Sequence, residues 1–266
     1  MAGPQKLIVL GSGTSVPKAG RTTSCYLVDP GDGQALAIDL GPGALQRAAA
    51  VGYDLDHLRA VLLTHMHPDH TADLVALDFA LRNPIPRPDG PPLPILGHPD
   101  ARLLLARVRN AWPRWLGSGP DRLVVHDIGP GPLDDVLPGP VRARAYPIVH
   151  TWTSLGYRLE LPDGFVIAFS GDATECDELL KLGRDVDLFV LESAATDDEA
   201  ADERSPSSHL SPRQAGRIAA SCGARHLLLT HFYPPVLREP IEERVREAFE
   251  GRLDLAQDGM VVPLVR

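Results

Sequence analysis

Residues 64–70 read Thr-His-Met-His-Pro-Asp-His and follow directly on a short apolar run at residues 60–63. Such a run is typical of a buried strand. In an extended chain the side chains of residues i and i+2 point the same way, so His65 and His67 can bind one metal ion. Past the proline the chain must turn, which points Asp69 and the last histidine elsewhere. The spacing therefore predicts one short loop that supplies ligands to two neighbouring metal ions.

Further candidate ligands stand where other predicted strands end. They are Asp39 after residues 36–38, His150 after 141–149, Asp172 after 165–171 and His231 after 226–230. Each polar side chain follows a strand that we predict to be buried, so we expect all of them at one edge of the sheets.

The order of predicted elements favours an α/β fold. Strands are predicted at residues 7–10, 24–28, 36–39, 60–63, 94–97, 141–149, 155–160, 165–169, 186–192, 226–230 and 260–265. Helices are predicted at 45–50, 71–81, 101–109, 175–182, 212–222 and 241–249, with loops at 83–94 and 193–208. Two sheets packed face to face with helices outside them fit this order. The halves, approximately 1–140 and 141–266, echo each other, so we predict a single domain, 1–266, with an internal duplication.

Composition and charge exclude several classes of protein. The net charge of -9 disfavours broad non-specific binding of nucleic acids, which needs many Lys and Arg contacts to phosphate. No apolar stretch approaches the roughly 20 residues of a membrane span, and the first residues do not resemble a secretory signal. The three cysteines, Cys25, Cys176 and Cys222, are isolated, which suggests a reducing compartment. We therefore expect a cytoplasmic protein that does not associate with membranes.

The HxHxDH pattern at residues 65–70, the Ser-Gly-Asp at 170–172 and the Leu-Leu-Thr-His at 228–231 together resemble the metallo-β-lactamase superfamily. The resemblance implies a four-layer αββα sandwich of two mixed β-sheets with a dinuclear metal site, usually of zinc. It also implies the ligand sets: His65, His67 and His150 for one metal, Asp69, His70 and His231 for the other, and Asp172 as the bridge between them.

The ligand chemistry supports two divalent ions independently. Imidazole and carboxylate ligands suit zinc, with manganese or iron as alternatives. Two divalent cations outweigh the two carboxylates, so the site should attract an anionic phosphate ester. Paired metals can generate a hydroxide and stabilise the attacking and leaving oxygens. Asp39 has two interpretations: it ties the metal loop by hydrogen bonds, or it caps the turn at residues 41–43.

Two further segments, residues 10–17 and residues 191–196, resemble the ribonuclease Z-like branch of the superfamily. The resemblance implies that Glu192 orients His209, which assists at the phosphate or at the leaving group. Ser211 begins a Ser-Pro-Arg-Gln sequence, which predicts a helix N-cap with a capping box and would hold His209 in place.

One departure from that branch bears on the substrate. Enzymes that process tRNA carry a long arm between the third metal histidine and the bridging aspartate, whereas here only 22 positions separate His150 from Asp172. The segment 197–203 is also acidic and should repel a long polyanion. We therefore do not expect tRNA as the substrate, and favour a small or cyclic phosphodiester.

Residues 101–122 combine five arginines with Trp112 and Trp115, so they form either a substrate wall or a solvated helix face with two core tryptophans. The remaining histidines fit ordinary core positions: His57, His98, His126 and His226.

The leading hypothesis is a dinuclear metal-dependent phosphodiesterase in which a metal-bound hydroxide attacks phosphorus, Asp69 orients or deprotonates that water, and His209 assists the leaving oxygen. The alternatives are a ribonuclease Z-type endonuclease, a lactonase or β-lactamase-like acyl hydrolase, and a non-catalytic scaffold. Homodimers are frequent among the enzymes that the chain resembles.

Overall fold

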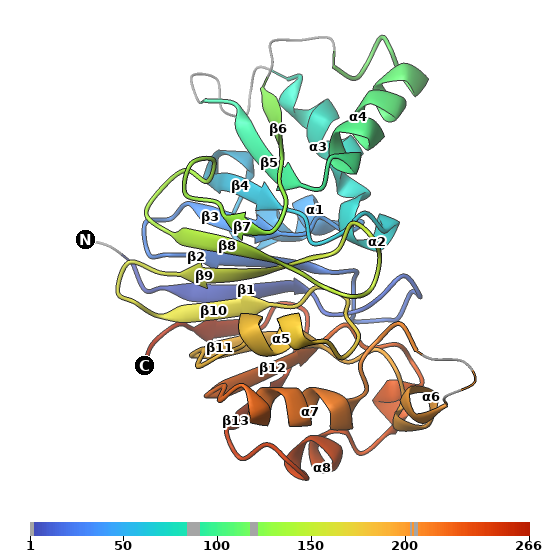
Figure 1. The fold of residues 1–266 in the computed structure, drawn as a ribbon. Coiled ribbons are helices and arrows are strands. Elements are labelled where there is room, and N and C mark those ends of the chain that lie inside the picture. Colours follow the sequence, from blue (N-terminus) through green and yellow to red (C-terminus); the bar gives the residue numbers. More distant parts are fainter. Residues whose placement is uncertain (1–2, 84–90, 118–121, 203, 205–206) are drawn as a thin grey trace.

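Two seven-stranded β-sheets pack face to face in the computed structural model, which describes residues 3–83, 91–117, 122–202, 204 and 207–266 (Figure 1). In spatial order, the first sheet contains β14 (Val261–Pro263), β1 (Lys6–Gly11), β2 (Cys25–Asp29), β3 (Ala35–Ile38), β4 (Leu58–Leu62), β5 (Leu93–Gly97) and β6 (Leu123–Asp127). The second contains β13 (Arg252–Leu255), β12 (His226–Thr230), β11 (Leu188–Glu192), β10 (Val166–Phe169), β9 (Leu155–Glu160), β8 (Arg142–Pro147) and β7 (Gly131–Pro132).

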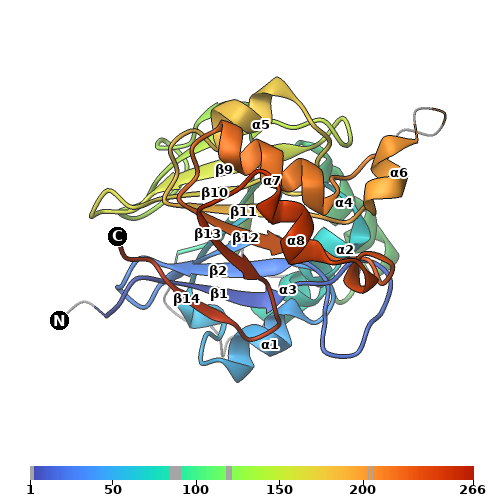
Figure 2. The same ribbon diagram turned by 90° about the horizontal axis from the view of Figure 1, so that it is seen from below.

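Helices cover the outer face of both sheets (Figure 2). The first sheet is covered by α1 (Ala44–Ala50), α3 (Asp73–Leu81) and α4 (Asp100–Ala111). The second is covered by α5 (Asp177–Leu182), α7 (Pro212–Ser221) and α8 (Ile241–Arg246). The short elements are α2 (Pro68–Thr71), α6 (Asp197–Ala201) and the 3-10 turns Leu55–His57 and Val236–Arg238. The predicted four-layer α/β sandwich is therefore confirmed.

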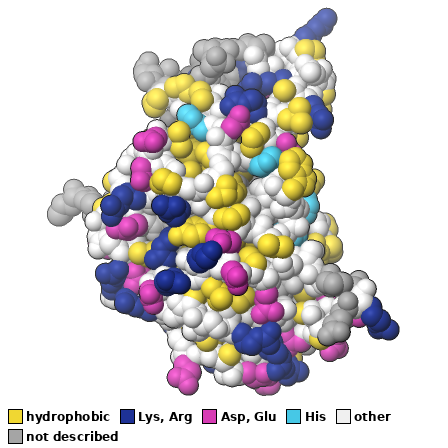
Figure 3. All heavy atoms as spheres, viewed as in Figure 1, with side chains coloured by type: hydrophobic (Ala, Val, Ile, Leu, Met, Phe, Trp, Pro, Cys, Tyr) yellow, Lys and Arg dark blue, Asp and Glu magenta, His cyan; other side chains and the backbone are white. Residues whose placement is uncertain are grey.

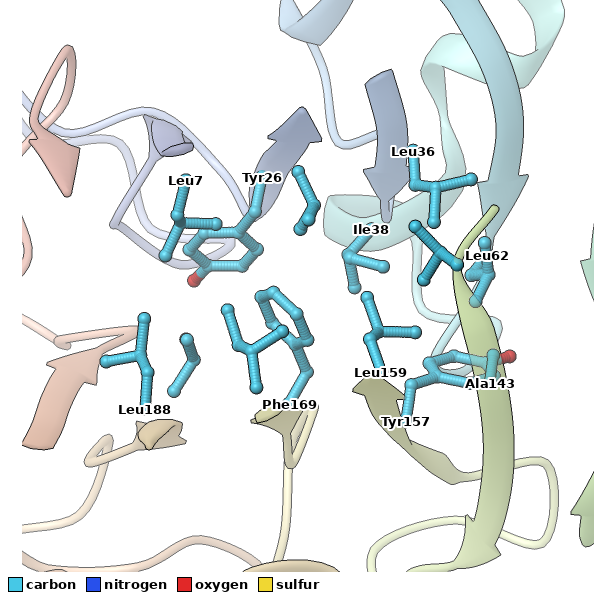
Figure 4. Close-up of a cluster of buried hydrophobic side chains, with 14 of the residues drawn as sticks. Leu7, Tyr26, Leu36, Ile38, Leu62, Ala143, Tyr157, Leu159, Phe169 and Leu188 are labelled. Carbon is cyan, nitrogen blue, oxygen red and sulfur yellow. The ribbon is translucent and has the colours of Figure 1, made fainter. Parts of the chain in front are cut away.

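The central core lies between the two sheets (Figure 4). Leu7 and Ile38 project from the first sheet toward Tyr157 and Phe169 of the second, and all four are at most 1% exposed. The Tyr26 ring lies 5.7 Å from that of Phe169. Burying one such side chain stabilises the fold by about 1.5–3 kcal/mol, so this layer fixes how the sheets face each other.

Strand direction brings the candidate site together. In the first sheet β3, β4 and β5 are parallel, and in the second β10, β11 and β12 are parallel. The carboxyl ends of neighbouring parallel strands lie at one edge, which is where ligands bind in open α/β sheets. Asp39, His65, Asp172 and His231 come after β3, β4, β10 and β12, and Glu192 is the last residue of β11.

Several elements differ from the sequence-based expectation. The predicted metal loop becomes helical at Pro68, so the predicted helix at 71–81 is divided between α2 and α3. The predicted loop at 193–208 contains α6, whose capping box joins Thr196 and Glu199. Three strands were not predicted: β6, β7 and β13. Most of the predicted loop at 83–94 falls on 84–90, outside the described residues.

The division into two halves stays a prediction. β7 belongs to the first half of the sequence but pairs with β8 in the second sheet, and β14 belongs to the second half but pairs with β1 in the first sheet. Each half therefore contributes one edge strand to the sheet of the other.

The helices in the described part of the chain are too short or too polar to cross a bilayer. The cysteines Cys25, Cys176 and Cys222 are all free.

Candidate metal centre

Four of the predicted ligands form a first cluster. One ligand atom from each of His65, His67, His150 and Asp172 lies within 4.8 Å of all the others. Nε2 of His150 lies 3.3 Å from Nδ1 of His67, and Asp172 Oδ2 lies 3.7 Å from Nε2 of both His65 and His150. The strand end after β4 therefore supplies two imidazoles that face the third, as the i, i+2 spacing predicts.

A second cluster joins Asp69, His70 and His231, again with one ligand atom from each within 4.8 Å of the others. Nε2 of His231 lies 3.3 Å from Nε2 of His70 and 3.6 Å from Oδ2 of Asp69. Asp69 and His70 face this second cluster because the chain enters α2 at Pro68. The helical turn rotates them away from the direction of His65 and His67.

Asp172 faces both clusters with different oxygens. Its Oδ2 lies toward His65 and His150, whereas its Oδ1 lies 3.3 Å from Nε2 of His70 and 3.4 Å from Nδ1 of His231. The carboxylate follows Gly171, which has a φ of 61° and would bring a Cβ atom to 2.7 Å from Cβ of Thr64. Only glycine fits there without displacing the metal motif, so the close approach of β10 to β4 depends on it.

The donor set fits divalent metal ions. Nε2 of His65 and Nδ1 of His231 are buried, and neither atom has a hydrogen-bond partner within the described part of the chain. A buried polar atom that lacks a partner is costly, and a bound cation would satisfy it. Five imidazoles and two carboxylates around adjacent points are the ligand types that zinc accepts. His65, His67, His150, Asp69, His70, His231 and Asp172 would hold the ions.

Charge within the site keeps the carboxylates ionised. Burial alone would raise the pKa of Asp172, but the neighbouring His231 and His70 lower it well below its usual range. Burial likewise opposes the ionised form of Asp69, yet contact with His231 and the charge of His70 lower its pKa to about 2. Burial, together with His70, lowers the pKa of His65 to about 2, which leaves that imidazole neutral. Metal binds ionised carboxylate and neutral imidazole, so His65 is already in its binding form. Despite its burial, the pKa of His70 is raised well above its usual value by Asp172 and Asp39, so that imidazole releases a proton when a metal binds.

Asp39 ties the metal motif to β3. Its side chain is 1% exposed and accepts hydrogen bonds from the Thr64 backbone N–H (2.7 Å), from Thr64 Oγ1 (2.8 Å) and from His70 Nδ1 (2.7 Å). The alternative, a cap for the following turn, is wrong, because the backbone N–H groups of Gly43 and Leu45 donate to Asp73 instead. Asp39 thus fixes the ring of one ligand and the backbone beside another.

We expect Asp39→Asn to weaken metal binding by about 10–100-fold, because partners of this kind orient ligands and raise their basicity. Titration of metal-free protein with Zn²⁺ measures the affinity. Asp29→Asn is the matched control. Asp29 is also buried and hydrogen-bonded, to Gly31 and Tyr53, but it ends β2 at the edge of the sheet opposite to Asp39. Equal weakening in both variants would contradict a specific role for Asp39.

Glu192 and His209 form the predicted pair. Nδ1 of His209 lies 2.8 Å from Oε1 of Glu192, which is 1% exposed and also accepts from the N–H groups of Ala173 and Ala194. Although burial opposes the charge, the hydrogen bond and charge of Glu192 raise the pKa of His209 to about 9. The predicted capping box at Ser211 is confirmed and begins α7 just after His209.

The His209 ring lies beside the metal ligands. Its centroid is 4.9 Å from that of His150 and 5.9 Å from that of His231. A ligand atom of His209 also lies within 4.8 Å of atoms of Asp172 and His231. The side chain is 17% exposed, so it is not a surface loop histidine and can reach a substrate bound at the clusters.

Arginines partly neutralise the negative charge of the acidic segment 197–203. Residue 203 itself lies outside the described residues. Asp197 lies 3.4 Å from Nε of Arg213 and 3.3 Å from Nε of Arg244. Asp202 pairs with Arg204, and the carboxylate of Glu199 accepts hydrogen bonds from the N–H and the hydroxyl of Thr196. Repulsion of a polyanion by this segment is therefore a weaker argument than the sequence alone suggested.

The segment 101–122 does not hold core tryptophans. Trp112 and Trp115 are 50% and 57% exposed and line a hollow of about 430 Å³ with Ala72, Val75, Ala76, Phe79 and Leu116. Arg109 donates to both oxygens of Asp78, and Arg102 pairs with Asp127. These two arginines thus stabilise α4, and a role of the segment as a substrate wall stays a prediction.

Three of the remaining histidines have carboxylate partners. His98 Nδ1 lies 3.7 Å from Oδ1 of Asp100. His226 bonds to Asp254 at 2.8 Å, as expected of an ordinary structural histidine. His57 bonds to Asp54 but its side chain is 43% exposed, so its core interpretation is wrong.

Two aromatic residues near the centre were missed in the sequence. Tyr233 lies two positions after His231, and its ring is 5.8 Å from that of His209 and 6.1 Å from that of His231. Its hydroxyl lies 3.1 Å from Oγ of Ser15, in the turn after β1. Trp152 lies two positions after His150. Each lies two positions after a predicted ligand, and this spacing could have indicated that both rings lie near the metal centre.

Residues 25–232 match the family model of a β-lactamase superfamily domain. Since this is most of the chain, and the two sheets and the ligand clusters follow the same pattern, the protein belongs to the metallo-β-lactamase superfamily.

Similar proteins span almost the whole chain. Rv1339 of Mycobacterium tuberculosis is 33% identical over 249 residues, which are 92% of this chain and 87% of that protein. A protein of Mycobacterium bovis (strain BCG / Pasteur 1173P2) named ribonuclease Z is 31% identical over 274 residues, covering 95% and 96%. The crystal structure of the metallo-β-lactamase fold protein YhfI from Bacillus subtilis is 25% identical, with a TM-score of 0.81 and coverage of 97% and 99%.

Proposed function

We propose that the protein is a dinuclear metal-dependent phosphodiesterase that acts on a small or cyclic phosphodiester. The observation that carries the proposal is that the two oxygens of Asp172 face separate ligand clusters, with the Glu192–His209 pair beside them. A phosphodiester needs a nucleophile, stabilisation of charge on its oxygens, and help for the leaving group. The proposed site has a group for each task.

Each residue has a distinct proposed role. Bound divalent ions would supply a hydroxide nucleophile at neutral pH and neutralise charge on the phosphate oxygens. Asp69 is ionised and orients the attacking water or accepts its proton. His209, held by Glu192, gives a proton to the leaving oxygen as its bond to phosphorus breaks. Glu192 fixes the ring of His209, because its own carboxylate is held by two backbone N–H groups.

The path from His150 to Asp172 supports a small substrate. It consists of a turn, β9, a second turn and β10, both strands being hydrogen-bonded into the second sheet. All of these residues are within the described structure, and they contain no protruding arm. A long RNA would therefore lack the contacts that such an arm provides.

The second candidate is a ribonuclease Z-type endonuclease. It is favoured by the mycobacterial relative named ribonuclease Z, whose length is covered to 96% by this chain. That relative is named ribonuclease Z and has little sequence outside the match, so the small size of this chain does not by itself exclude an RNA substrate.

A substrate screen tests the proposal. Metal-free protein is reloaded with Zn²⁺ or Mn²⁺, and elemental analysis is expected to give about two ions per chain. Hydrolysis is then measured on bis-p-nitrophenyl phosphate, cyclic nucleotides, pre-tRNA, a lactone and nitrocefin. We expect turnover of the small phosphodiesters and loss of turnover on chelation. Turnover confined to pre-tRNA would favour the endonuclease, and turnover confined to the lactone or nitrocefin would contradict phosphodiester chemistry altogether.

A further inference from the structure

Trp152 lies at the rim of the metal centre with most of its surface in water. It is 76% exposed, more than the other exposed large hydrophobic side chains in the described part of the chain. It lies two positions after His150, so its Cα lies within about 7 Å of that of a proposed ligand. A single exposed apolar residue is common on protein surfaces, so its exposure alone proves nothing. Its surroundings are more informative.

A second aromatic ring supports the indole. The His98 ring lies 4.8 Å from that of Trp152 at an interplanar angle of 86°, an edge-to-face contact. His98 follows β5, which is parallel to β4, so it reaches the same edge of the sheets as the metal motif. In Figure 3 histidine and hydrophobic side chains lie together on the right-hand flank, where Figure 1 places α2.

The turn that carries Trp152 is fixed to the metal motif. The Thr151 N–H donates to Oγ of Ser154 (3.1 Å), and Thr151 Oγ1 lies 2.9 Å from the hydroxyls of Thr153 and Ser154. The N–H of Leu155 then donates to the carbonyl of Thr64 at 2.7 Å. The backbone under Trp152 is thus held against the residue that precedes His65. Such preorganisation lowers the entropic cost of binding.

We propose that Trp152, braced by His98, is a stacking surface for the nucleobase of a nucleotide substrate whose phosphodiester lies at the metal centre. The inference rests on the proposed phosphodiesterase function and narrows its substrate class to nucleotides. A planar base can stack on an exposed indole with little dependence on base identity, and each such contact typically changes affinity by about 5- to 100-fold. A cyclic nucleotide carries both a base and an anionic diester.

The first test compares two substrates in Trp152→Ala. For 2′,3′- or 3′,5′-cyclic AMP we expect KM to rise by about 5- to 100-fold with little change in kcat. For cyclic glycerol phosphate, which has no aromatic ring, kcat/KM should stay the same. Trp152→Phe should retain most of the affinity for the nucleotide. Val51→Ala is the control, because Val51 is an exposed hydrophobic residue at the end of α1, in a hollow lined by Asp29 and not by metal ligands, so kcat/KM should stay the same for both substrates.

The second test does not depend on turnover. In a Trp112→Phe, Trp115→Phe protein the remaining tryptophan is Trp152, and titration with AMP should quench its fluorescence, whereas ribose 5-phosphate should not. Equal loss on both cyclic substrates, or no quenching by AMP, would overturn the stacking proposal while leaving the phosphodiesterase intact. Quenching by AMP in a protein that hydrolyses no phosphodiester would instead refute the proposed reaction and retain the base site.

Discussion

Asp172→Ala is expected to lower kcat/KM on a phosphodiester by at least about 1,000-fold and to reduce the metal content below two ions per chain. The two oxygens of Asp172 face different clusters, so one substitution removes an anionic ligand from both. Loss of the charge stabilisation that paired metals supply is worth several kcal/mol, and each 1.36 kcal/mol is a tenfold change in rate. Elemental analysis and steady-state kinetics on the same reloaded sample measure both effects.

The matched control for this variant is Asp187→Asn. Asp187 is likewise buried in the second sheet, but it precedes β11 at the opposite edge, where Arg225 and Arg266 pair with it. We expect this variant to lose stability and to keep its metals and its activity. Circular dichroism on both proteins separates metal loss from unfolding. An Asp172→Ala protein that is folded, active and loaded with two ions would refute the bridging role.

The metal ligands could be predicted from the sequence because their chemistry and their position coincide. Except for His150, which comes after the alternately exposed and buried β8, the ligands follow apolar runs that form buried strands, and parallel strands place their carboxyl ends at one edge. The i, i+2 spacing of His65 and His67 predicted their shared cluster. The sequence did not indicate that a helix begins at Pro68. It still predicted that Asp69 faces away from the first cluster, because a turn and a helix both direct the side chain that way.

The missed strands are β6, β7 and β13, the outermost strands of their sheets, and most of their residues are half-buried or exposed. An edge strand packs on fewer neighbours, so β7 and β13 lack the continuous apolar run that marks β10 or β12. β6 does contain such a run, Leu-Val-Val, and could have been predicted from its sequence. β13, with the sequence Arg-Leu-Asp-Leu, forms because β12 offers it a hydrogen-bonding partner. Local sequence does not contain that information.

The role of Asp39 depended on contacts between distant segments. Its place after a strand allowed either a cap or a hydrogen-bonded tie, and only the approach of Thr64 and His70 decides between them. The backbone at Asp39 has a φ of 61°, and His231 has a φ of 58°. Both lie in a region that side chains other than glycine rarely adopt, and such strain concentrates at functional sites. No sequence pattern in this chain indicated either conformation.

His209→Ala is expected to lower kcat on an alkyl phosphodiester by about 100- to 10,000-fold, the usual contribution of a general acid. The loss should be smaller on bis-p-nitrophenyl phosphate, because nitrophenolate leaves without needing a proton. Metal content should stay near two ions, since each cluster has its own ligands without His209. Metal loss in this variant would instead identify His209 as a ligand, and unchanged kcat on both esters would remove it from the reaction, as an acyl hydrolase would predict.

His226→Ala is the matched control for this variant. His226 forms a similar histidine–carboxylate pair, with Asp254, at the opposite end of β12. Its removal should leave kcat on both esters unchanged, so a loss there would mean that the assay reports stability and not catalysis.

The pH profile of Glu192→Gln tests how the acid is tuned. Glu192 raises the pKa of His209 to about 9, so the imidazole is protonated below that pH and loses its proton as the pH rises through it. Activity that depends on the protonated form must therefore fall on the alkaline side. Glutamine keeps a hydrogen bond but removes the charge, which lowers the pKa of His209, so the fall should move to lower pH. An unmoved alkaline limb would mean that a different group titrates there, and that Glu192 only positions the ring.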